Sequence, residues 1–273
     1  MKKFEGMLIC TDLDGTLLQK NKEISKKNLD AIEYFKAEGG YFTFITGRMP
    51  FSANEYYQAV RPNAPVGCIN GGGIYDYPTN RYLWTNELSR DALELVEYLD
   101  QNMSGLGVQI NTFEKIYFCQ ENEAMVWFRN VTGAPNITRP LREVTEPIAK
   151  IVFGETDPQK MLRLQEILNE HPLAEKFHLI RSERILYEIL PKDSNKGVLL
   201  PRCVDILGID PGKIIAVGDY NNDVEMLRDA HLGIAVANAT PEAKAVADHI
   251  TVSNDEDAIA QIIEDLDTGK LKL

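Results

Sequence analysis

Short apolar runs alternate with a helical pattern near the start of this sequence, and that alternation restricts how the chain can fold. Residues 7–10 and 41–45 carry the apolar, aromatic and β-branched side chains typical of buried strands. Between them, a helical pattern begins after Ser25 and ends at Gly39 and Gly40. A strand, a helix and a second strand in this order form a unit with parallel strands, so we expect a parallel sheet covered by helices.

The alternation is interrupted in the middle of the chain and then resumes. Residues 82–190 mix helical runs with strand pairs, which indicates a separate α+β module. A helix over residues 196–207, a strand over residues 214–217 and further strand and helix patterns follow. The sequence therefore predicts an α/β fold, in which a doubly wound, Rossmann-like parallel sheet is formed by residues 1–81 and 191–273 and the α+β module is inserted as a second domain.

Two aspartates, Asp12 and Asp14, stand at the end of the first apolar run, with Leu13 between them. Alternate residues of an extended chain point the same way, so both carboxylates can face one bound group while Leu13 packs on the opposite side. Neighbouring carboxylates that lose hydration repel each other, so the pair implies a counter-cation such as a divalent metal. This geometry suits phosphoryl transfer, with Asp12 as the nucleophile and Asp14 as the group that transfers a proton.

Other candidate residues follow later strands, because parallel sheets bind ligands at the carboxyl ends of their strands. Thr46 follows the second strand, and its hydroxyl could hold a phosphoryl oxygen. Asp219 follows the strand after the module and would be a second carboxylate for a hard cation, for which Mg²⁺ is the candidate. Asn222 and Asp223 would orient the metal's ligands or contact the substrate, although they would also serve as helix caps. Lys196 begins a helix and would neutralise charge on the transferred phosphoryl group.

Taken in order, these residues resemble the motifs of the haloacid dehalogenase (HAD) superfamily, and in particular its Cof-type, class IIB sugar-phosphate phosphatases. The similar segments are Thr11-Asp12-Leu13-Asp14-Gly15-Thr16-Leu17, Thr46-Gly47-Arg48, Asn70-Gly71-Gly72, Ser194-Asn195-Lys196-Gly197, residues 218–223, Met226 and residues 235–239. The resemblance covers nearly the whole chain. It implies that residues 1–81 and 191–273 form the catalytic core and that residues 82–190 form an inserted α+β cap that determines substrate specificity.

The resemblance also implies a role for each residue of the site. The implied Mg²⁺ ligands are Asp12, Asp219 and the backbone of Asp14. The implied phosphate or substrate contacts are Thr46, Gly47, Arg48, Lys196 and Asn222. Asp223 would orient residues of the site without contacting the ligand itself.

The implied activity is Mg²⁺-dependent hydrolysis of small phosphorylated metabolites, sugar phosphates in particular, through a covalent aspartyl phosphate. A flavin-pathway phosphate is a competing substrate. A phosphomutase is the alternative enzyme, since it also needs Asp14, whereas cleavage of a carbon–halogen bond does not. An alternative of a different class is a non-catalytic sensor of Mg²⁺ or a phosphometabolite, which the presence of both Asp12 and Asp14 disfavours.

Charge and composition restrict the classes of partner that the protein is expected to bind. The chain has 29 Lys and Arg against 41 Asp and Glu, a net charge of −12 that repels nucleic acid and anionic membranes. The first apolar run is too short for a signal peptide, and the four widely spaced cysteines indicate buried thiols in a cytoplasmic protein. We therefore expect a small phosphorylated ligand, no nucleic-acid or membrane partner, and a monomer or small homo-oligomer.

Overall fold

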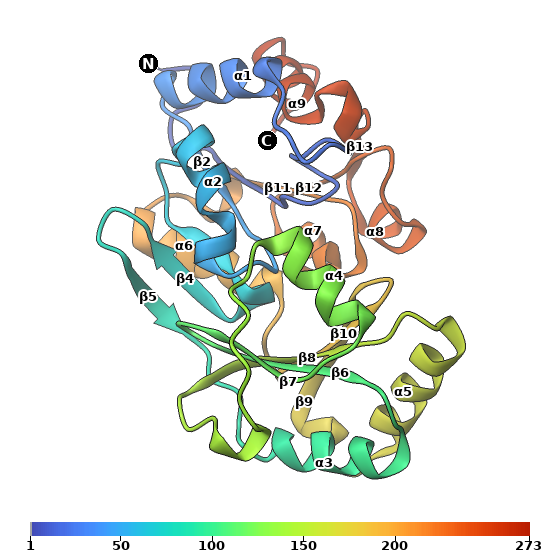
Figure 1. The fold of residues 1–273 in the computed structure, drawn as a ribbon. Helices are drawn as coiled ribbons and strands as arrows, with labels where there is room; N and C mark the ends of the chain where they lie inside the picture. Colours follow the sequence, from blue (N-terminus) through green and yellow to red (C-terminus); the bar gives the residue numbers. More distant parts are fainter. Residues whose placement is uncertain (1) are drawn as a thin grey trace. The chain divides into compact units, whose positions relative to one another are not determined.

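The computed structural model describes residues 2–273, which form two compact units drawn in Figure 1. The first unit contains the chain up to Trp84 and again from Asn195 to Leu273, and the second contains Thr85–Ser194. Each unit has its own apolar core. Within the described part of the chain, no helix is long and apolar enough to cross a membrane.

A parallel sheet is the framework of the first unit, and its strands follow the order β13, β12, β11, β1, β2, with β1 between β11 and the edge strand β2. The bounds are β1 Leu8–Thr11, β2 Tyr41–Phe44, β11 Ile214–Gly218, β12 Leu232–Ala235 and β13 His249–Ile250. Leu8 of β1 pairs with Ile214 on one side and with Tyr41 on the other. Strand β1 therefore joins the two segments of chain that make this unit.

Helices surround this sheet, and one buried side chain connects two of them. The bounds are α1 Lys26–Ala37, α2 Pro50–Val60, α6 Leu199–Leu207, α7 Val224–Asp229, α8 Pro241–Val246 and α9 Ala258–Asp267. As predicted, Ser25 caps α1, because its hydroxyl accepts a hydrogen bond from the N–H of Asn28 at 3.0 Å. The buried Asn28 Oδ1 in turn accepts a hydrogen bond from the N–H of Ala260 at 2.9 Å, which connects α1 to α9.

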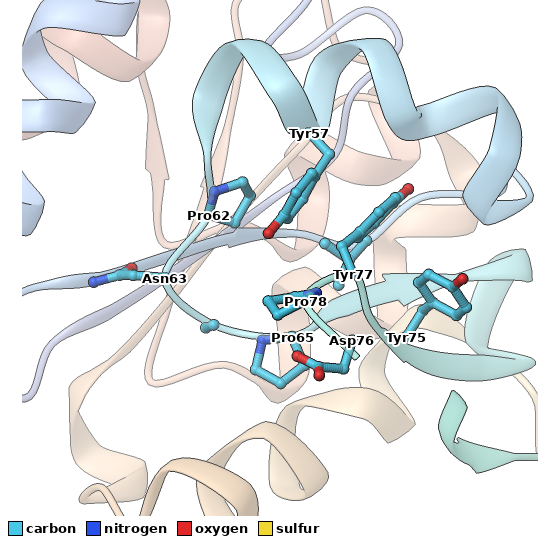
Figure 2. A pocket seen from close by; sticks show the side chains of 10 residues that line it. Tyr57, Pro62, Asn63, Pro65, Tyr75, Asp76, Tyr77 and Pro78 are labelled. Atoms are coloured by element: carbon cyan, nitrogen blue, oxygen red, sulfur yellow. The ribbon is translucent and has the colours of Figure 1, made fainter. Parts of the chain in front are cut away.

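A small antiparallel sheet belongs to the same unit and consists of β3 Val66–Cys68, β4 Gly73–Asp76 and β5 Arg81–Thr85. A 3₁₀ turn, Ile69–Gly71, joins β3 to β4 and contains part of the Asn70-Gly71-Gly72 segment that carries the resemblance. Figure 2 shows a pocket beside this sheet, lined in part by Tyr57, Tyr77 and Asp76. The rings of Tyr57 and Tyr77 stack with their centroids 4.0 Å apart. This pocket contains none of the residues predicted for the active site.

The second unit is an antiparallel sheet in the order β7, β6, β8, β10, β9, with helices on both faces (Figure 1). Its strands are β6 Gly107–Thr112, β7 Ile116–Gln120, β8 Ile148–Gly154, β9 Phe177–Glu183 and β10 Leu186–Pro191, and its helices are α3 Ala92–Asn102, α4 Glu123–Thr132 and α5 Pro158–Glu170. Apolar residues of α3 and α5 pack with Ile151 and Phe153 of β8 in one core. Met125 of α4 instead packs beside Gly107 and Gly154, on the opposite face. The predicted fold class, a parallel α/β sheet with an inserted α+β module, is confirmed.

Replacing Asn28 with alanine should lower the free energy of unfolding by about 1–3 kcal/mol, because the buried N–H of Ala260 would lose its acceptor. Chemical denaturation followed by circular dichroism measures the change. Lys27→Ala, at an exposed position of the same helix, is the control. Equal stability of the two variants would show that the link between α1 and α9 contributes nothing.

Candidate active site

Lys196 lies at the centre of the site, and its side chain is completely buried. Its Nζ donates a hydrogen bond to Asp12 Oδ1 at 2.6 Å and another to Asp223 Oδ1. Asp12 follows β1, Asp223 ends the 3₁₀ turn after β11, and Lys196 begins a 3₁₀ turn before α6. Three segments that are distant in sequence therefore meet at one ammonium group. Burial alone would lower the pKa of Lys196, but the two carboxylates raise it above its usual range, so the side chain stays charged.

Asp223 holds both the lysine and the backbone that carries Asp219. Its Oδ1 accepts from Lys196, while its Oδ2 accepts from the N–H groups of Asp219 and Tyr220 at 2.9 and 3.0 Å. The side chain has no measurable exposure. Because both carboxylate oxygens are engaged, this geometry supports the predicted orienting role of Asp223.

Asp12, Asp219 and Asp223 each offer a carboxylate oxygen, and these three oxygens lie within 4.8 Å of one another. Burial raises the pKa of Asp12 to about 7; Lys196 lowers it, but repulsion from Asp223 and Asp14 adds to the rise. Burial, followed by repulsion from Asp12 and Asp223, raises the pKa of Asp219 to about 8. Such a cluster is stabilised by a cation, and carboxylate oxygens are the ligands that Mg²⁺ prefers. The residues therefore fit a hard divalent metal between Asp12 and Asp219.

Thr16 and Gly15 shape the surroundings of Asp219. The Thr16 hydroxyl donates a hydrogen bond to Asp219 Oδ1 at 2.7 Å. Gly15 has a left-handed backbone with φ +85°, and a Cβ atom at this position would collide with Asp219 Oδ2. The sequence predictions assign no role to Thr16, although it stands within the motif that identified the aspartates. Its position two residues after Asp14 is the signal that could have revealed it.

Asp14 has different partners from Asp12. Arg48 donates from Nε to Asp14 Oδ2 at 2.7 Å and from Nη2 to Oδ1 at 2.9 Å, and Lys22 Nζ donates to Oδ1 at 2.9 Å. Burial would raise the pKa of Asp14, but hydrogen bonds and charge from Arg48, with a contribution from Lys22, lower it to about 2. The predicted proton-transfer residue is therefore a carboxylate held by two cations in this structure.

The loop after β2 meets the turn after β3 beside these groups. Thr46 is almost fully buried, and its hydroxyl accepts a hydrogen bond from the N–H of Arg48 at 3.2 Å. A Cβ atom on Gly47 would lie 2.8 Å from Asn70 Oδ1, so only glycine fits without displacing that amide. Asn70 Oδ1 also accepts a hydrogen bond from Asn222 Nδ2 at 3.0 Å. These contacts place Asn222 next to the predicted phosphate-binding loop.

The structure places every predicted site residue in the first unit. It joins them as an inner group of Asp12, Lys196, Asp219 and Asp223, a pair of Asp14 and Arg48, and a loop group of Thr46, Gly47 and Asn222. The sequence predictions miss Lys22 because they treat the loop that carries it only as a connection. They also assign no contact to Asn70, although its glycine-rich turn is part of the resemblance.

Comparison with known proteins gives a consistent result. The family model for haloacid dehalogenase-like hydrolases matches residues 9–263. Putative phosphatase YxeH of Bacillus subtilis is 30% identical over 274 residues, covering 96% of this chain and 99% of that protein. The 5-amino-6-(5-phospho-D-ribitylamino)uracil phosphatase YitU of the same organism is 28% identical over 269 residues, covering 94% and 96%. A haloacid dehalogenase-like hydrolase from Bacteroides thetaiotaomicron has a similar structure, with a TM-score of 0.83, 25% identity and coverage of 95% and 99%.

Gly15→Ala should weaken Mg²⁺ binding by about 10- to 100-fold, because the added methyl group displaces Asp219 from its orientation. Isothermal titration calorimetry with MgCl₂ measures the affinity. Gly105→Ala is the matched control, since Gly105 has a similar left-handed φ of +81° but open space around the added atom. Unchanged Mg²⁺ affinity in Gly15→Ala would contradict a metal site that uses Asp219.

Proposed function

This chain belongs to the haloacid dehalogenase-like hydrolases and is a phosphatase of small phosphorylated molecules, and we propose that it hydrolyses sugar phosphates with Mg²⁺ through an aspartyl phosphate on Asp12. One observation carries the proposal. Asp12 directly follows β1, with one oxygen held by the buried Lys196 and with Asp219 beside it. A fixed carboxylate next to a buried cation and a metal-type cluster is suited to attack on phosphorus.

The proposed reaction has two halves. In the first, a carboxylate oxygen of Asp12 forms a bond to phosphorus as the ester bond breaks, and Asp14, which must be in its protonated form for this step, gives its proton to the departing alkoxide. In the second, water attacks the phosphorus of the aspartyl phosphate and gives its proton to Asp14. The bond between Asp12 and phosphorus breaks, which yields inorganic phosphate and restores both aspartates.

Each remaining residue has a proposed task in this reaction. Lys196 holds Asp12 in place and offsets negative charge as the nucleophile approaches the phosphoryl group. Thr46 and the backbone of Gly47 bind phosphoryl oxygens, Arg48 and Asn222 contact phosphate or substrate, and Asp223 positions Lys196 and the backbone of Asp219. Asp12, Asp219 and the backbone carbonyl of Asp14 would hold Mg²⁺. A bound Mg²⁺ supplies positive charge that stabilises the phosphoryl oxygens in the transition state.

The substrate class rests on the resemblance and on one relative. YitU is named for a phosphate ester on a ribityl chain. A phosphorylated sugar or sugar-alcohol chain is therefore the proposed substrate class, and the flavin-pathway phosphate remains a specific competitor within it. We also propose that the inserted unit, Thr85–Ser194, governs substrate selection and that the protein is cytoplasmic, as a monomer or small homo-oligomer.

Phosphate release from a panel of sugar phosphates, nucleotides and a flavin phosphate tests the activity. Wild type should release phosphate with Mg²⁺ and not with EDTA, and Asp12→Asn should lower kcat by at least about 1,000-fold because the nucleophile is lost. Asp205→Asn, on the exposed face of α6, is the control for the amide substitution. Full activity in EDTA would refute the role of Mg²⁺. Interconversion of sugar phosphates without phosphate release would instead identify a phosphomutase, and binding without either reaction would identify a sensor.

Rapid mixing with excess substrate tests the covalent intermediate. If hydrolysis of the aspartyl phosphate is the slower half, the alcohol product should appear in a burst of about one equivalent per site before steady release of phosphate. Acid quenching should trap the phosphoryl group on the protein of wild type and not of Asp12→Asn. Trapping at the same level in both proteins would exclude Asp12 as the nucleophile.

A further inference from the structure

Both carboxylate oxygens of Asp14 are held by cations that come from two different segments. Arg48 follows β2 and binds through two nitrogens, and Lys22 lies in the loop between β1 and α1 and binds Oδ1. The Asp14 side chain is 35% exposed, so its orientation is not enforced by close packing. These hydrogen bonds therefore determine where the carboxylate points.

The two cations differ in how closely their side chains are packed. The Arg48 side chain is only 9% exposed, its Nη1 donates to the carbonyl of Ser52 at 3.1 Å, and its guanidinium lies 5.0 Å from the ring centre of Tyr56. The Lys22 side chain is 47% exposed, and its Nζ donates a hydrogen bond to Asp14 Oδ1 at 2.9 Å. Arg48 is thus held in place by its surroundings, whereas the half-exposed Lys22 side chain is not enclosed by packing.

A tight turn brings Lys22 back to Asp14. The backbone bridge between Asp14 and Leu18 starts the return of the chain, and the N–H of Lys22 donates to the carbonyl of Gln19 at 2.9 Å. Lys22 has a left-handed backbone with φ +65°, which is uncommon for a residue other than glycine. This conformation lets the turn close while the lysine side chain extends to a carboxylate eight residues earlier.

We propose that Lys22 and Arg48 form a cation clamp that positions Asp14 for proton transfer, which makes Lys22 a positioning residue of the reaction. The inference rests on the proposed function, because it assigns the proton transfer to Asp14. The clamp fixes the direction of the Asp14 side chain, which must reach the departing alkoxide in the first half of the reaction and the incoming water in the second. Small displacements of a catalytic group lower rates strongly, so ion pairs that orient Asp14 matter more than an ordinary surface ion pair.

Two substrates with different leaving groups distinguish an effect on the position of Asp14 from an effect on phosphate binding. An alkyl phosphate needs a proton on its leaving oxygen, whereas 4-nitrophenyl phosphate releases a stable anion without one. The value of kcat/KM for each ester reports the steps up to cleavage of that ester bond. Lys22→Met should lower kcat/KM by about tenfold or more for an alkyl phosphate and by less than about threefold for 4-nitrophenyl phosphate.

Three further variants define the result. Asp14→Asn should show the same selective loss to a greater extent, and Lys22→Arg should restore most of the alkyl-phosphate activity because it keeps a cation of similar reach. Lys20→Met is the matched control, since Lys20 lies on the same turn but pairs with Asp255 at 2.9 Å. Its ratio of alkyl to aryl activity should equal that of wild type.

Other outcomes would overturn the clamp. Equal losses for both esters in Lys22→Met would identify Lys22 as a phosphate contact, and no loss for either would make the ion pair a surface contact only. If wild type hydrolyses neither ester, nor any compound of the panel, with Mg²⁺ present, both the proposed function and the clamp are refuted. Hydrolysis of both esters by wild type with an unchanged ratio in Lys22→Met would remove the clamp alone.

Discussion

The buried ammonium group of Lys196 is the interaction on which the site depends. Asp12 and Asp223 are both nearly inaccessible to water. Without a cation between them, the two carboxylates would repel each other and would be poorly solvated. Lys196 compensates both with two hydrogen bonds. A metal can then be held on the side of Asp12 that faces Asp219. Lys196 thus fixes the position of Asp12, which is proposed to react, and of Asp223, which holds the backbone of Asp219.

The site also depends on close approach of backbone segments, which glycine permits. Gly71 has a φ of +95°, and a Cβ atom there would collide with the carbonyl of Asn195, next to Lys196. A Cβ atom on Gly197 would lie 3.0 Å from the backbone of Glu225, so the turn that carries Lys196 can pack against α7 only without a side chain. The lysine is therefore placed by contacts of its neighbours. This is why the buried charge of Lys196 can occupy a defined position at the start of a short 3₁₀ turn.

The framework of the first unit could be predicted from the sequence because its strands are short, apolar and separated by capped helices. The carboxylates that follow these strands could be predicted for the same reason, since parallel strands end at one edge. Lys196 required the resemblance, because an isolated lysine carries no periodic signal and lies 184 positions from its partner Asp12. Lys22 could not be predicted, because its approach to Asp14 depends on the left-handed backbone of one turn. The contact of Thr16 with Asp219 joins residues 203 positions apart, and the only signal for it in the sequence is the position of Thr16 within the first motif.

The order of strands has a consequence for synthesis of the protein on the ribosome. Strand β1 is bonded by β2, which is made soon afterwards, and by β11, which emerges only after the whole of Thr85–Ser194. The inserted unit can therefore fold while β1 still lacks one neighbour, as domains generally fold when they emerge. Until β11 arrives, Asp12 has neither Asp219 nor Asp223 beside it, and the nascent chain cannot assemble its acidic cluster. The site can therefore form only after β11 has paired with β1.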